Sequence, residues 1–208
     1  MKKLAALIVI ISLIQIGYCN ITYSEILNTR TNNAKPFNEF LDKFIKAFNE
    51  KNTSEVNKYI YSEYGLFVLD NPGAFGVVER FNSFDEIMNL DFDYNIGSLK
   101  NSKIDCNFNK GTIPYYNCDN EEQEGWNKEG CYYDKHKTNL ITKLYKTMLE
   151  YNLGDANIIK TDVKIAEKAQ AYISHLAYST YNSIGFYFGI IDNNWYLICI
   201  DKITPCDA

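Results

Sequence analysis

The chain has 208 residues and a formal net charge of -5, with 21 Lys and Arg residues against 26 Asp and Glu residues. Nucleic acids and anionic membrane surfaces are bound by positively charged faces, and no cluster of basic residues occurs here, so the composition argues against both as partners. With 17 Tyr and 12 Phe residues, the chain is expected to fold around a heavily aromatic core.

The first nineteen residues predict export. Two lysines precede an apolar run over residues 4–16, which is typical of a secretory signal peptide. The run is shorter than the roughly 20 residues that a membrane-spanning helix needs, so the mature chain is expected to be soluble unless it is tethered.

The residues at the end of this leader are compatible with two kinds of processing, cleavage that releases the chain or lipidation that anchors it. Cleavage after Gly17 or Cys19 would release the mature chain, whereas residues 16–19 (IGYC) also resemble a bacterial lipobox, which makes Cys19 a candidate for lipidation. We therefore expect a protein that is secreted, periplasmic or lipid-anchored to the cell envelope. It would contact a membrane only if Cys19 is lipidated.

The mature chain is predicted to be a linker, residues 20–35, followed by a single α+β domain over residues 36–208. Behind Pro36, six apolar residues recur with helical spacing and predict an amphipathic helix. They are Phe37, Phe40, Leu41, Phe44, Ile45 and Phe48.

Shorter elements follow in the first half. Thr53 is expected to cap a second helix, and residues 65–69 read as a buried strand ended by Asn-Pro-Gly at 71–73. Ser83 and Glu86 have the spacing of a capping box, which predicts the start of another short helix.

The second half combines helices with strands. Residues 96–118 favour two strands, and residues 119–130 form a polar loop. Apolar residues between Thr138 and Gly154 predict a helix, and a further helix is possible over residues 162–171. Apolar runs at 184–191 and 195–200 then flank an Asp-Asn-Asn turn, which indicates a C-terminal hairpin.

Five cysteines of the mature chain are candidates for disulfides: Cys106, Cys118, Cys131, Cys199 and Cys206. A hairpin turning at residues 109–111 would put Cys106 opposite Pro114 and about 13 Å from Cys118. A disulfide tolerates at most about 7 Å between Cα atoms, so that hairpin and a Cys106–Cys118 bridge exclude each other.

A bridge from Cys118 to Cys131 is therefore preferred, with Cys199 to Cys206 or Cys106 to Cys206 as the second. Since no pair has the C-x-x-C spacing, no zinc or other metal site is expected. No cofactor is expected either, because glycine-rich nucleotide-binding patterns do not occur.

Helices followed by a sheet give an α+β order. With its opening helix at 37–48, a short helix leading into residues 64–67 and a closing hairpin through 189–197, the chain resembles the nuclear-transport-factor-2-like superfamily. The resemblance implies N-terminal helices packed on a curved antiparallel sheet that ends in a long C-terminal hairpin, with a cone-shaped pocket. Some members place an Asp/His pair in that pocket for proton transfer.

Candidate catalytic residues are few. The chain has two histidines, and neither a G-x-S-x-G nor an H-E-x-x-H motif occurs. His175 lies in a segment that could be a strand facing a cavity beside Tyr178, whereas His136 is expected in a solvated loop. A working base also needs a positioned partner, and the sequence identifies none.

Two other candidates lie in or near the polar loop. Asp119, Glu121 and Gln123 alternate as at the start of a calcium loop, but glycine falls at the seventh position and the twelfth lacks glutamate, which favours a solvated surface loop. Trp126 has no apolar neighbours in sequence, so it is a candidate contact residue, either exposed or folded over a groove.

The sequence predicts an exported, non-catalytic module that binds a small apolar ligand or an envelope protein, with Trp126, His175 and Tyr178 as candidate contacts. The alternative is a small hydrolase or isomerase that uses a pocket Asp or Tyr with His175.

Overall fold

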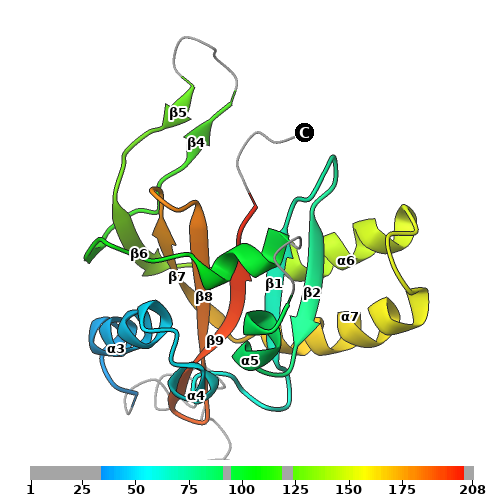
Figure 1. Cartoon of the computed structure of the whole chain (residues 1–208), viewed down its shortest axis with the longest axis horizontal. Coiled ribbons are helices and arrows are strands. Elements are labelled where there is room, and N and C mark those ends of the chain that lie inside the picture. Colours follow the sequence, from blue (N-terminus) through cyan, green and yellow to red (C-terminus); the bar gives the residue numbers. More distant parts are fainter. Residues whose placement is uncertain (1–33, 91–94, 119–123, 204–208) are drawn as a thin grey trace, which may run out of the picture. The chain divides into compact units, whose positions relative to one another are not determined.

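The computed structural model describes residues 34–90, 95–118 and 124–203 (Figure 1). The helices are α3 (Phe37–Asn49), α4 (Thr53–Asn57), α5 (Phe84–Met88), the 3-10 helix η1 (Asn95–Lys100), α6 (Leu140–Glu150) and α7 (Ala156–Gln170). The strands are β1 (Leu66–Asp70), β2 (Val77–Phe81), β3 (Phe108–Lys110), β4 (Tyr116–Asn117), β5 (Gly125–Trp126), β6 (Cys131–Lys135), β7 (Ile173–Ser179), β8 (Ile184–Ile191) and β9 (Asn194–Asp201).

Seven of these strands form one sheet in the order β2-β1-β9-β8-β7-β6-β3, and β4 pairs with β5 in a separate two-stranded sheet. The large sheet is mostly antiparallel, so the predicted α+β class is confirmed at this level. Two pairings are parallel, between β1 and β9 and between β3 and β6. β9, the last strand along the described chain, is an inner strand of the sheet and lies between β1 and β8.

One face of the sheet is covered by α3, whose predicted apolar stripe is buried. Phe44 lies 5.2 Å from Phe186 and 5.1 Å from Phe188 between ring centroids, both nearly edge-on. Phe48 contacts Phe186 in the same way, at 5.1 Å. Edge-to-face ring pairs stabilise a core beyond the area they bury, so this aromatic layer fixes α3 on β8.

The other face is covered by α6 and α7 (Figure 1). Tyr145 and Met148 from α6 and Ile159 from α7 join a second core cluster with sheet residues such as Phe67 and Tyr187. Since β8 is buried along nearly its whole length, the continuous apolar run that predicts this strand reflects a position between two helical layers.

The turn between β8 and β9 follows from its residues. Asp192 and Asn193 have φ angles of 49° and 64°, the left-handed region that Asn and Asp tolerate better than most residues. A two-residue loop with this geometry matches the twist of antiparallel strands. Asn194, which the sequence places in the turn, instead begins β9.

Several helix starts differ from the predictions. Asn52, not Thr53, caps α4, because its side chain accepts a hydrogen bond from the Glu55 N–H. Ser83 caps α5 as predicted by accepting from the Glu86 N–H. The last helix, α7, begins well before residue 162, because Asp155 accepts from the N–H groups of Asn157 and Ile158.

The predicted hairpin within residues 96–118 is wrong. The segment contains η1, β3 and β4, and the two strands do not pair with each other. β3 instead adds parallel to β6, and β4 pairs with β5. Both strands are short, and each pairs with a strand outside the segment 96–118. The pattern of residues within the segment therefore does not indicate these pairings. β5 lies within the predicted polar loop.

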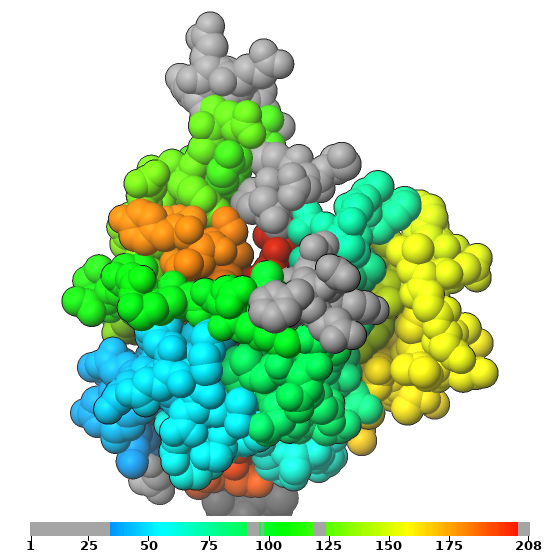
Figure 2. Space-filling model, in the orientation of Figure 1, coloured from blue at the N-terminus to red at the C-terminus, as the bar shows by residue number. Residues whose placement is uncertain are grey.

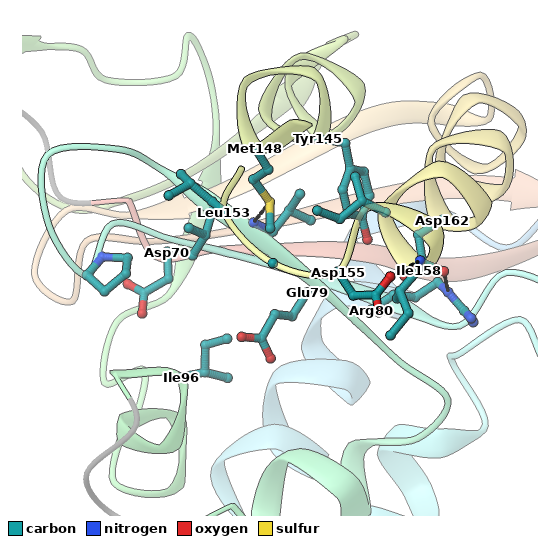
Figure 3. Close-up of a pocket in the computed structure, with 15 residues that line it drawn as sticks. Asp70, Glu79, Arg80, Ile96, Tyr145, Met148, Leu153, Asp155, Ile158 and Asp162 are labelled. Carbon is teal, nitrogen blue, oxygen red and sulfur yellow. Dashed lines mark hydrogen bonds and ion pairs between the residues drawn. The ribbon is translucent and has the colours of Figure 1, made fainter. Parts of the chain in front are cut away.

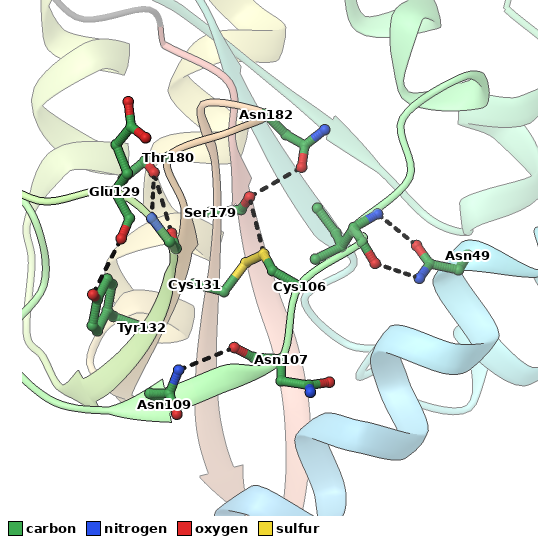
Figure 4. Close-up of a disulfide and its surroundings, with 12 residues drawn as sticks. Asn49, Cys106, Asn107, Asn109, Glu129, Cys131, Tyr132, Ser179, Thr180 and Asn182 are labelled. Atoms are coloured by element: carbon green, nitrogen blue, oxygen red, sulfur yellow. Dashed lines mark hydrogen bonds between the residues drawn. A yellow bond between two sulfur atoms is a disulfide. The ribbon is translucent and has the colours of Figure 1, made fainter.

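The predicted disulfide pairing is also wrong. Cys131 bonds to Cys106, with 5.9 Å between the Cα atoms (Figure 4), which excludes both Cys118–Cys131 and Cys106–Cys206. Cys199 is a buried free thiol, which excludes Cys199–Cys206. The error follows from the wrong hairpin: with β3 beside β6, Cys106 is brought next to Cys131. Cys206 and Cys19 lie outside the described residues.

Two hydrogen bonds also hold the segment that precedes Cys106. Asn49, at the end of α3, donates from Nδ2 to the Ile104 carbonyl, and its Oδ1 accepts from the Ile104 N–H, both at 2.8 Å (Figure 4). The segment before β3 is thus fixed at one end by a helix and at the other by the disulfide. Within the described ranges, no helix is long and apolar enough to cross a membrane.

The α3 packing gives a stability prediction. Phe44 is fully buried, so Phe44→Ala should lower the free energy of unfolding by about 3 to 5 kcal/mol, through lost apolar burial and the cavity left behind. Chemical denaturation measures this. Tyr181→Ala, at a side chain that is 63% exposed, is the control and should change it by less than about 0.5 kcal/mol. A loss below about 1 kcal/mol for Phe44→Ala would contradict the packing of α3 on β8.

Candidate functional site

A pocket of about 710 Å³ lies at the edge of the sheet, and we call it the β2 pocket. It is lined by residues from β1, β2, η1, α6, α7 and the segment between α6 and α7 (Figure 3). The lining residues are Asp70, Pro72, Val77, Val78, Glu79, Arg80, Ile96, Tyr145, Met148, Leu153, Gly154, Asp155, Ile158, Ile159 and Asp162. A volume of this size is in the range of small-molecule sites.

The pocket follows the open edge of β2, since four consecutive residues, 77–80, line it. A site on one face of a sheet would be lined by alternate residues only, because successive side chains point to opposite faces. Asp70, Glu79 and Ile96 lie on one side of β2, while Tyr145 and Met148 lie on the other (Figure 3). The pocket therefore bends around the strand edge.

Part of that edge is covered by α6. The Val78 N–H donates a hydrogen bond to Met148 Sδ at 3.3 Å. A thioether is a weak acceptor, but this contact fills the place that a carbonyl of a further strand would take. The ligand space therefore lies beside this contact, between β2 and the helices.

The single arginine of the pocket is already engaged. Arg80 Nε–H donates to Asp162 Oδ1 at 2.6 Å, and both side chains are largely buried. Arg80 also donates from Nη1 to Asn82 Oδ1 at 3.3 Å. Asp155 is engaged as well, because its carboxylate caps α7. These groups shape the wall of the pocket and leave little free charge on the α7 side.

The other two carboxylates lie on adjacent strands, Asp70 on β1 and Glu79 on β2. Burial raises the pKa of Asp70, while the Asn71 N–H and the charge of Lys202 partly lower it. Burial also raises the pKa of Glu79, and the charge of Asp70 raises it further. In the folded domain, the interactions of these two carboxylates with their neighbours therefore do not fully offset the cost of burying their charged forms.

The Tyr145 hydroxyl is a buried polar group in the same pocket. Tyr145 is 2% exposed, and its hydroxyl has no hydrogen-bond partner among the described residues. In Figure 3 the hydroxyl points toward the space between β2 and α7. Burial raises its pKa, and the negative charge of Asp162 raises it further. It is therefore a neutral phenol that can donate one hydrogen bond and accept others.

Apolar residues are exposed near one end of the pocket. Phe75 from the β1–β2 turn stacks on Tyr151 at the end of α6, with 4.4 Å between ring centroids. Both rings are substantially exposed, and Ile158, which lines the pocket, is 63% exposed. Figure 2 shows the segments that carry them, teal for β1–β2 and yellow for α6–α7, side by side on the surface. Exposed apolar groups gathered in this way are typical of binding sites.

The sheet separates the candidate contacts named from the sequence. His175 is half-buried on the α3 side, with ring centroids 4.5 Å from Phe37 and 4.9 Å from Trp195. Tyr178 lies on the other side, where Trp126 packs against it at 5.2 Å. Trp126 and Tyr178 thus come together away from His175, and none of the three lines the β2 pocket.

The contacts of His175 are mainly aromatic. Its Nδ1 lies 3.1 Å from Ser174 Oγ, and no ion pair with a carboxylate exists within the described part of the chain. Burial, followed by the positive charge of Lys135, lowers the pKa of His175 to about 4. The imidazole is therefore neutral at pH 7 and behaves as part of the aromatic core.

His136 lies in a loop, as the sequence predicts, but its side chain is half-buried rather than solvated. It comes just after β6, and its ring centroid lies 5.7 Å from that of Tyr187. Tyr187 in turn donates from its hydroxyl to Asp201 Oδ2 at 3.4 Å. Burial raises the pKa of Asp201 to about 6. The sequence does not predict this polar cluster, because its members come from the loop after β6, from β8 and from β9.

Nothing in the described ranges supports a metal site, since no three His, Cys, Asp or Glu side chains there could hold an ion together. The candidate calcium residues Asp119, Glu121 and Gln123 lie outside those ranges. No protein family, no curated protein and no solved structure matches the chain.

The burial of His175 gives a pH prediction. Because its folded-state pKa of about 4 lies below the usual 6.5, its neutral form stabilises the domain above pH 6.5, and this stabilisation is lost as the pH falls toward 4. His175→Phe should remove this dependence, so that between pH 7 and pH 4 the variant loses about 1 to 3 kcal/mol less stability than the parent.

Denaturant unfolding at several pH values measures the difference. Asp201 titrates with the opposite sign, because its raised pKa makes the folded domain favour the protonated acid, but it is present in both proteins and cancels in the comparison. Parallel stability curves for the two proteins would contradict the burial of a neutral His175.

Proposed function

We propose that the chain is an exported, non-catalytic binding module whose ligand occupies the β2 pocket. The observation that carries this proposal is the buried Tyr145 hydroxyl, which has no hydrogen-bond partner among the described residues, in a pocket whose walls combine apolar and charged side chains. Ligand sites combine apolar walls with a few placed polar groups, and a buried polar group without a partner costs about 1 to 3 kcal/mol. A ligand that hydrogen-bonds to Tyr145 would recover this cost.

The exposed apolar residues extend the same site. Ile158 continues the pocket wall onto the surface, and the stacked Phe75 and Tyr151 rings lie on the segments that flank it. An amphipathic small molecule fits this gradient from a buried polar end to an exposed apolar end. An envelope protein inserting one side chain is the other partner compatible with the expectation from the sequence.

The alternative function, a hydrolase or isomerase that depends on His175, has weaker support. A general base needs a positioned partner and access to substrate, whereas the described contacts of His175 are Ser174 and aromatic rings. The relationship to the nuclear-transport-factor-2-like superfamily is also a proposal. It is supported by the order of elements, with α3 and α4 before the sheet and β8–β9 near its end.

Methyl NMR tests the binding site with decanol, a neutral amphipathic probe. We expect saturable shifts for the methyl groups of Met148, Ile158 and Ile159, because they line the pocket, and no shift for Ile184, which is buried elsewhere. Ile158→Asn should weaken binding by removing apolar contact area.

Tyr181→Asn is the matched control, since both side chains are 63% exposed and only Ile158 lines the pocket. It should bind decanol like the parent. Absence of saturable shifts at the pocket methyl groups, or equal loss of binding in both variants, would overturn the proposed site.

The intact mass of the protein from its native host tests export. We expect a mass that corresponds to cleavage after Gly17 or Cys19, or a larger one if Cys19 carries lipid. Comparison before and after reduction also counts the disulfides, including the Cys106–Cys131 bond. Retention of the full leader would contradict export.

A further inference from the structure

We propose that the ligand of the β2 pocket is an organic cation, an amine or guanidinium on an apolar body, and that Glu79 with its neighbour Asp70 recognises the cationic group. This inference rests on the proposed function and adds the chemical class of the ligand. It is carried by the charges that line the pocket and by which of them already have partners.

Four carboxylates line the pocket, from Asp70, Glu79, Asp155 and Asp162, against one guanidinium, from Arg80. Arg80 and Asp162 neutralise each other, and Asp155 is used by the N-terminus of α7. The remaining charge is negative and lies on Asp70 and Glu79. A carboxylate, sulfate or phosphate ligand would meet like charges here, which weakens the binding of anionic ligands relative to neutral or cationic ones.

Of the two remaining carboxylates, Glu79 has fewer neighbouring groups that offset its negative charge. Lys202 lies close enough to Asp70 for its charge to lower the pKa of that acid, and the Asn71 N–H donates to Asp70 at 3.0 Å. The backbone of Glu79 is paired with β1, but among the described residues its carboxylate has no ion pair and no side-chain hydrogen bond. In Figure 3 its carboxylate extends away from β2 toward Ile96, into the pocket.

The rest of the pocket accommodates an apolar body. Val77 and Ile96 lie beside Glu79, while Met148, Leu153 and Ile158 continue the apolar lining toward the helices. Because the pocket bends around the edge of β2, one ligand can place its cationic group at Glu79 and a hydrogen-bonding group at the Tyr145 hydroxyl. The two polar anchors would then fix its direction along the strand edge.

Three probes that each contain ten carbon atoms test this inference: decylammonium, decanol and decanoate. Each probe is titrated into the full mature protein, and binding is followed by the NMR signals of the Met148 and Ile159 methyl groups. We expect decylammonium to bind about ten-fold more tightly than decanol, as one partly buried charge pair implies, and decanoate to bind more weakly than either. Added salt should reduce the advantage of decylammonium.

Glu79→Gln should remove most of the ten-fold preference for decylammonium over decanol. Glu167→Gln is the matched control, because Glu167 is exposed on α7 and does not line the pocket; it should keep the preference. Since burial raises the pKa of Glu79, neutralising it should not impair folding. Asp70→Asn provides a second variant on the adjacent strand.

A hexapeptide with one lysine among apolar residues identifies the source of the cation. Tighter binding than decylammonium would assign the cation to a peptide side chain, and weaker binding would assign it to a free amphiphilic amine; both support a cationic ligand. Equal binding of decylammonium and decanol, or a preference that survives Glu79→Gln, would overturn the inference and leave the proposed pocket intact. If none of the probes shifts the pocket signals, the proposed function fails as well.

Discussion

The burial of the β8–β9 hairpin on both faces is the constraint on which the rest of the fold depends. Its side chains alternate between two apolar layers, and neither layer is complete without a helix. The phenylalanine stripe of α3 covers one face, with Phe44 and Phe48 against β8. On the other face, α6 and α7 cover residues such as Tyr187 and Cys199. The β2 pocket lies where this second layer reaches the last strand of the sheet.

The elements that the sequence predicts correctly are those in which buried apolar residues recur at regular spacing, or without a break, along one segment. The spacing of the phenylalanines predicts α3 because every turn of that helix contributes to one face. The runs at 184–191 and 195–200 predict strands because β-branched and aromatic residues follow one another without polar interruption. In both cases the signal is contained within one segment, so no knowledge of its partner is needed.

The elements that the sequence does not predict depend on contacts between distant segments. β2 is five residues long and includes Glu79 and Arg80, so its pattern is not distinctive. The pairing of Phe67 with Cys199 joins β1 to β9 across most of the chain, and no local pattern encodes it. The pocket has the same origin, because its residues come from three separate parts of the chain, 70–80, 96 and 145–162. The sequence marks Trp126 as a candidate contact residue, but its packing against Tyr116 and Tyr178 depends on β4 and β7, which no local pattern places beside it.

The position of β9 has a consequence for how the domain folds. Among the described strands β9 is synthesised last, and it lies between β8 and β1, so the two parts of the sheet cannot join until residue 201 has been synthesised. Until then, β1 and β2 lack the neighbour that joins them to the other strands. Such non-local pairing slows folding and prolongs the exposure of apolar surface. Removal of the last strand would therefore divide the sheet into two parts rather than shorten it from one edge.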